Sequence, residues 1–127
     1  MSLRTPLGKV LGKGSAKDGT EHWWLQRVTA VALLFLGGWF LLSLFRVDDF
    51  THATIYAWAG QPFNGVMLLL LAVALTWHSA LGVQVVIEDY VHGPFIKVVS
   101  LILSKFVHVF LAFAGIYAVL RVAFGGA

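Results

Sequence analysis

The sequence predicts an all-α integral membrane protein with three transmembrane helices. Of its 127 residues, 59% are hydrophobic and only 12% are charged, whereas soluble domains carry about 25% charged residues. The apolar residues fall into three long blocks. In a soluble globular protein they would be spread along the chain, so this clustering argues against a globular core. Basic residues lie at the ends of these blocks, which is typical of membrane topology and not of a phosphate-binding surface.

The spans follow from the uncharged blocks. Residues 28–45 and 66–87 contain no charge, and each block is close to the roughly 20 residues that a bilayer-spanning helix needs. The third block contains Lys105, which near a helix end can extend to the lipid headgroups. We predict spans over about residues 24–45, 66–88 and 98–120, within one anchor domain over residues 21–127. Residues 1–20, rich in Lys, Gly and Ser, are predicted to form a flexible basic tail.

Charge also predicts the orientation of the chain. Lys and Arg precede the first span, whereas the loop after it holds Arg46 against Asp48 and Asp49. Because basic residues favour the cytoplasmic side, we expect a cytoplasmic N-terminus and a periplasmic C-terminus. We predict a multi-pass protein of the bacterial inner membrane, with the mitochondrial inner membrane as the less favoured alternative.

Several kinds of chemistry are excluded within this chain. It has no cysteine, so it forms no disulfide, iron–sulfur or thiolate zinc site. It has no Gly-rich phosphate loop and no recognisable nucleophile–base pair. We therefore predict no catalytic residue in the isolated chain.

Polar side chains at membrane depth are costly, so they mark candidate sites, and His78 is the strongest of them. It lies near the middle of the second span, and a neutral imidazole is a usual axial ligand of haem iron. Gly82, one turn later, would leave room for a macrocycle or for a closely packed helix. The alternative role for His78 is an interhelical hydrogen bond. A second axial ligand could come from His108 on the third span or from a partner subunit.

The end of the second span holds Glu88, Asp89, Tyr90 and His92. Such a group could bind a quinone carbonyl and move its protons, with the phenol as donor and the carboxylate as relay. The alternative is that these residues have no binding role and are simply polar and aromatic side chains at the membrane–water interface, where such residues are common.

The start of the first span carries Trp23 and Trp24, which are typical interfacial anchors. Arg27 could extend to lipid phosphate, or it could pair with a buried anion such as a haem propionate. We interpret His52, in the opposite loop, as a solvated residue.

Residues 78–90 resemble the second transmembrane helix of the smaller membrane anchor of succinate dehydrogenase, respiratory complex II. The family pattern is a histidine, a glycine one turn later and an Asp-Tyr pair at the helix end, here His78, Gly82, Asp89 and Tyr90. Residues 22–30, which end in Gln-Arg-Val-Thr-Ala, are similar to the start of that family's first helix. The resemblance covers about residues 21–122.

The resemblance implies a partnership with a second, three-helix cytochrome b anchor. Together the anchors would dock an iron–sulfur subunit and a flavoprotein, which hold the Fe–S clusters and FAD. His78 then matches the axial ligand of haem b, with the other histidine in the partner anchor. Tyr90 matches the tyrosine that binds ubiquinone, Asp89 its acidic neighbour, and Arg27 and His22 match groups near the haem propionates. The implied function is electron transfer from succinate to quinone, in the respiratory chain and the tricarboxylic acid cycle.

Other functions remain open at this point. A haem-free structural anchor would use His78 only to join helices, and a quinol:fumarate reductase anchor would share the architecture. A small proton channel is disfavoured because the apolar blocks 28–45 and 66–87 contain no ionisable residue except His78. No feature of the sequence indicates nucleic-acid binding.

Overall fold

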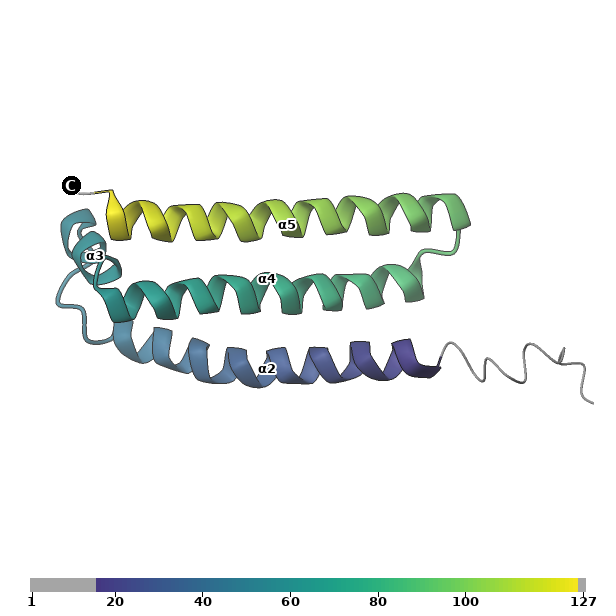
Figure 1. Cartoon of the computed structure of the whole chain (residues 1–127), viewed down its shortest axis with the longest axis horizontal. Helices are drawn as coiled ribbons and strands as arrows, with labels where there is room; N and C mark the ends of the chain where they lie inside the picture. Colours follow the sequence, from purple (N-terminus) through teal and green to yellow (C-terminus); the bar gives the residue numbers. More distant parts are fainter. Residues whose placement is uncertain (1–15, 126–127) are drawn as a thin grey trace, which may run out of the picture.

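The structure is a computed structural model that describes residues 16–125. These residues form helices and no strand, as predicted (Figure 1). The helices are α2 (Ala16–Leu44), α3 (His52–Ala59), α4 (Pro62–Tyr90) and α5 (Pro94–Phe124). Three segments are long and apolar enough to cross a membrane: Thr20–Leu44, Pro62–Tyr90 and Pro94–Phe124. The prediction of three spans is thus confirmed.

The helices are longer than the apolar blocks that predicted them. Helices α4 and α5 begin at Pro62 and Pro94, a few residues before the predicted membrane spans, which start near residues 66 and 98. Proline fits the first helical turn, since its fixed φ suits a helix and the amide hydrogen that it lacks has no partner there. Each helix therefore starts at its proline and not at the first residue of the apolar run.

The predicted basic tail lies mostly outside the described residues. Its last residues are helical, because α2 begins at Ala16 and not after residue 20. Once a helix is nucleated, each added residue gains a backbone hydrogen bond, so the helix extends past the apolar block.

The three long helices lie side by side in a row with α4 in the middle (Figure 1). Helix α4 packs against both α2 and α5 and lies between them (Figure 1). A Cβ added to Gly115 on α5 would lie 3.3 Å from the Ala72 Cβ on α4. The small residues therefore allow these two helices to approach closely, as is common in membranes.

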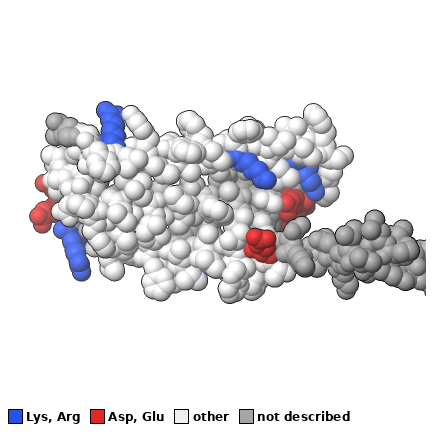
Figure 2. All heavy atoms as spheres, in the orientation of Figure 1, with Lys and Arg blue, Asp and Glu red and all other residues white. Residues whose placement is uncertain are grey.

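The row has no hydrophobic core of its own. No hydrophobic side chain among the described residues is buried, and large ones such as Leu34 (73%) and Phe35 (72%) are mostly exposed. In Figure 2 the charged side chains gather towards the two ends of the molecule and leave an uncharged band between them. Lipid or other protein must cover this band, because water would not solvate it favourably.

Helix α3 is a feature that the sequence analysis missed, since residues 46–65 were treated as a loop. Thr51 caps the helix by accepting a hydrogen bond from the Thr54 amide at 3.4 Å. The Asp49 carboxylate accepts hydrogen bonds from the Thr51 amide (3.0 Å) and hydroxyl (2.8 Å). The hydroxyls of Thr54 and Thr51, with the Thr51 amide, lower the pKa of Asp49 below its ordinary value. Trp58 of α3 stacks on Trp39 of α2 at 6.1 Å, so this helix closes one end of the row.

Candidate functional site

The predicted ligand His78 meets α2 through one hydrogen bond. Its Nδ1 lies 3.0 Å from the Thr29 hydroxyl, which is also 2.8 Å from the Leu25 carbonyl and 3.0 Å from the Gln26 carbonyl. A carbonyl only accepts and a hydroxyl has one proton, so we assign that proton to the α2 backbone. His78 Nδ1–H then donates to Thr29, and the lone pair of the imidazole lies on Nε2.

The Nε2 atom of His78 is chemically available. The residue is partly buried, and within residues 16–125 this nitrogen makes no hydrogen bond. Nothing lies within 4 Å of a Cβ added to Gly82, so the surface one turn away is open. The described residues contain no cluster of three His, Cys, Asp or Glu that could hold a bare metal ion. The site therefore fits a group such as haem, which brings its own ring nitrogens and needs only axial ligands.

His108 is held differently. Its Nδ1 lies 2.7 Å from the Ser104 carbonyl, to which it must donate, and its Nε2 lies 3.2 Å from the Ser79 hydroxyl on α4. The Nε2 lone pair therefore accepts from Ser79, and both ring nitrogens are used. His78 bonds to α2 while His108 lies between α4 and α5. The structure does not form the His78–His108 pair that spacing had left open.

The predicted quinone residues lie together in the last turn of α4. Asp89 and Tyr90 are exposed, Tyr90 by 77%, and within the described residues neither side chain makes a hydrogen bond. Lys97 Nζ donates to the Glu88 carbonyl at 2.8 Å, and Gln84 Nε2 donates to the Glu88 carboxylate at 2.8 Å. These contacts satisfy a carbonyl that the helix end leaves unpaired and hold the turn in place.

The residues at the start of α2 lie at the same end of the row, because α2 and α4 are antiparallel (Figure 1). The Arg27 guanidinium stacks over Trp23, with Cζ 3.8 Å from the ring centroid. His22 Nε2 is buried and has no hydrogen-bond partner among residues 16–125. A buried polar atom without a partner costs about 1–3 kcal/mol, so it marks a position where an external group would be bound favourably. Along the helix, Arg27 lies about 3 Å and His22 about 10 Å from the level of Thr29.

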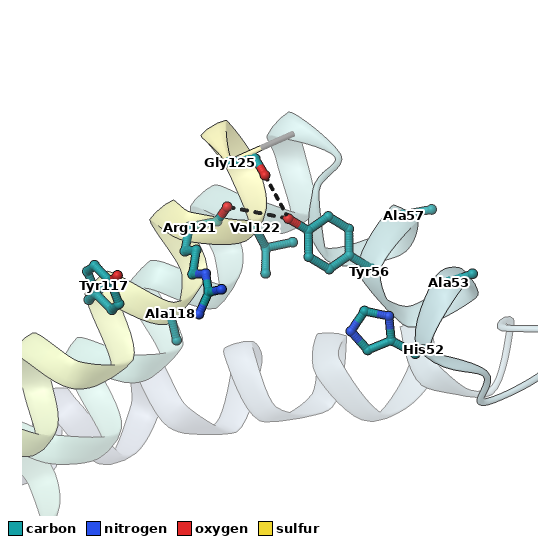
Figure 3. A pocket seen from close by; sticks show the side chains of 9 residues that line it. All are labelled: His52, Ala53, Tyr56, Ala57, Tyr117, Ala118, Arg121, Val122 and Gly125. Atoms are coloured by element: carbon teal, nitrogen blue, oxygen red, sulfur yellow. Dashed lines mark hydrogen bonds between the residues drawn. The ribbon is translucent and has the colours of Figure 1, made fainter. Parts of the chain in front are cut away.

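The opposite end of the row holds a separate pocket of about 890 Å³ between α3 and α5. Figure 3 shows His52 and Tyr56 of α3 facing Tyr117 and Arg121 of α5. The Tyr56 hydroxyl is within hydrogen-bond reach of the Gly125 carbonyl (3.2 Å) and the Arg121 carbonyl (3.5 Å). Of these residues, the sequence analysis had singled out only His52, as a solvated residue of a loop; its side chain is exposed, but it lies at the start of α3.

Thr29 is the site residue that sequence reasoning missed. Like His78, Thr29 is a polar side chain within a membrane span, where polar groups are energetically costly, so the same criterion could have selected it. Its pairing with His78, however, depends on the antiparallel register of α2 and α4. A single sequence carries no signal for that register.

These features define a class of protein: a multi-pass, all-helical membrane protein with a histidine near mid-span whose Nε2 makes no hydrogen bond among the described residues. Residues 1–119 match the family described as succinate dehydrogenase/fumarate reductase transmembrane subunit. The chain belongs to this family, and within it to the hydrophobic membrane anchors of succinate dehydrogenase.

Curated relatives agree with this assignment. The hydrophobic membrane anchor subunit of succinate dehydrogenase from Rickettsia bellii is 38% identical over 90 residues, which is 70% of this chain and 71% of the relative. The corresponding subunit from Paracoccus denitrificans is 31% identical over 125 residues, 98% of this chain and 96% of the relative. The succinate dehydrogenase membrane anchor subunit of Reclinomonas americana is 32% identical over 100 residues, 76% of this chain and 83% of the relative. No solved structure matches the chain.

Proposed function

We propose that this chain is the small anchor of a succinate:quinone oxidoreductase that helps to bind haem b and ubiquinone. In this role it docks the iron–sulfur and flavoprotein subunits and supports electron transfer from succinate to quinone. The observation that carries the proposal is the His78 imidazole, with Nδ1 bonded to Thr29 and Nε2 free at mid-span. Family membership supports the anchor role.

The chain provides one half of a haem site. Haem b, when bound, supplies a one-electron redox centre inside the membrane. His78 would hold the haem through Nε2, and a residue of the partner anchor would complete the site, since both ring nitrogens of His108 are used. Arg27, whose guanidinium has no ion pair among the described residues, would bind a propionate. His22 Nε2, which has no partner among the described residues, would bond to the same acidic edge.

The last turn of α4 contributes to the quinone site. The Tyr90 hydroxyl donates a hydrogen bond to a quinone carbonyl, and the Asp89 carboxylate holds or releases the accompanying proton. Tyr90 lies about 18 Å along the helix from His78, at 1.5 Å per residue. The high exposure of Tyr90 supports a pocket that other subunits complete.

The end of the row that holds His22 and Tyr90 faces the cytoplasm in this proposal. The charge pattern of the sequence supports that orientation. The iron–sulfur subunit then docks beside the quinone residues, and the C-terminus lies in the periplasm. Relatives from Rickettsia and Paracoccus support a bacterial inner membrane.

The first test is a reduced-minus-oxidised visible spectrum of the purified complex. We expect a b-type haem signal in the wild type and its loss in a His78→Leu complex that still assembles. Subunit co-purification shows whether the variant assembles. If the intact wild-type complex contained no haem, the haem-binding role would be refuted. The chain would then be a haem-free anchor, and only the proposed quinone role of Asp89 and Tyr90 would be left.

The second test separates the quinone site from the haem site. Tyr90→Phe removes a hydroxyl that donates to the quinone, so quinone reduction should fall by about 10²-fold. Haem content and succinate oxidation with an artificial acceptor should stay at the wild-type level. If both activities fell equally, Tyr90 would not have a local role at the quinone.

A further inference from the structure

A chain of hydrogen bonds connects His78 of α4 with the backbone of α2. His78 Nδ1–H donates to Thr29 Oγ1 at 3.0 Å, and the Thr29 hydroxyl donates in turn to the Leu25 carbonyl at 2.8 Å. Each bond in such a chain polarises the next, so the acceptor that His78 meets is stronger than an isolated hydroxyl. His78 therefore has a defined partner on the neighbouring helix.

We propose that Thr29 is a positioning residue for the iron ligand: it fixes the tautomer of His78, directs Nε2 and tunes the ligand's electron donation. The inference rests on the proposed function, because it requires His78 to bind haem iron. Thr29 itself touches neither haem nor quinone in this role.

The position of the Thr29 hydroxyl is well determined. A β-branched side chain has few χ1 rotamers in a helix, and bonds to the backbone three and four residues earlier select among them. Thr29 makes both bonds, to Gln26 and to Leu25. The acceptor is thus fixed to α2, and the His78 ring cannot rotate about χ2 without losing it. Among the described residues nothing else bonds to this ring.

An acceptor on Nδ1–H also changes the electronics of the ligand. It shifts electron density towards Nε2 and raises the basicity of the imidazole. A more basic axial ligand favours ferric over ferrous iron and lowers the reduction potential. A purely interhelical hydrogen bond would stabilise the fold without affecting the potential, so the potential separates the two roles.

The test uses redox titration of the haem in the assembled complex. Thr29→Val keeps the shape of the side chain and removes the acceptor. We expect a midpoint potential shifted to a more positive value and haem affinity reduced by about 10–100-fold. Thr29→Ser keeps the hydroxyl and should restore both properties towards the wild type.

Thr76 offers a matched control on α4. Its hydroxyl donates to the Ala72 carbonyl at 2.8 Å and the Val73 carbonyl at 3.1 Å, as Thr29 does on α2, but it has no histidine partner. Thr76→Val therefore removes the same kind of backbone bond without touching His78. It should leave the haem potential and haem content unchanged.

The outcomes distinguish this inference from the proposed function. A wild-type potential in Thr29→Val, or an equal shift in Thr76→Val, would overturn the positioning role while haem ligation by His78 stood. Haem retained in His78→Leu would overturn the ligation itself. If Thr29→Val does not assemble, Thr29→Cys provides a weaker acceptor in a similar volume. Its potential should then lie above that of the wild type, and an unchanged value would equally refute the role.

Discussion

The two histidines within the spans, His78 and His108, differ in the hydrogen bonding of their Nε2 atoms. Each uses Nδ1–H as a donor, His78 to a threonine on α2 and His108 to a carbonyl of its own helix. The Nε2 of His108 then accepts from Ser79, whereas that of His78 has no partner among the described residues. Depth in the membrane and residue type therefore do not distinguish these two side chains, whereas the hydrogen bonding of their ring nitrogens does.

The comparison also shows how α4 holds its neighbours. His78 and Ser79 are consecutive, so their side chains lie about 100° apart around the helix. One bonds to α2 and the other to α5. A single level of α4 is thus hydrogen-bonded to both outer helices.

The largest effect that separates the two histidines is expected from His108→Leu. The complex should keep its haem, in contrast to His78→Leu. Its free energy of unfolding should fall by about 0.6 kcal/mol, the average for interhelical hydrogen bonds in a membrane protein, and by no more than about 1.7 kcal/mol. Unfolding in mixed detergent–SDS micelles measures the stability, and the visible spectrum measures the haem. Loss of haem from an assembled His108→Leu complex would contradict the division of roles.

A smaller effect is expected from Ser79→Ala, which removes only the donor to His108 Nε2. The α4–α5 contact should weaken by about 0.5 kcal/mol in the same unfolding measurement. The haem potential should not move, because Ser79 bonds to His108 and not to His78. A shift as large as that of Thr29→Val would show that α5 also controls the ligand.

Much of the fold followed from the sequence because a bilayer imposes simple rules. Length, charge and hydropathy determined the three spans and the all-helical class. The two prolines mark the starts of α4 and α5, a few residues before the predicted membrane spans. Helix α3 was missed because it has only 8 residues and lies in the connection between two spans. The pattern that could have predicted α3 is Thr51, a residue type that often caps helices, followed by a run that contains Ala, Ile, Tyr and Trp.

The site was only partly predictable. His78 could be singled out because it is polar at membrane depth, but its partner Thr29 is 49 positions away in the sequence. The role of His108 was left open for a similar reason, since its contact with Ser79 depends on the rotation of two helices. The placement of His22, Arg27, Asp89 and Tyr90 at one end follows from the antiparallel order of the spans. Their roles towards haem and quinone stay predictions.

The flat arrangement of the helices bears on how the chain tolerates change. In a globular protein, substitutions are most damaging in an interior that the chain itself buries. Here no hydrophobic side chain among residues 16–125 is buried within the chain. In a scan of all single substitutions in the assembled complex, the intolerant positions should therefore mark contacts with other subunits more than contacts within this chain. Stripes of intolerant apolar positions on α2 and α5 would outline the footprint of the adjoining subunits, and the tolerant stripes would be those that face lipid.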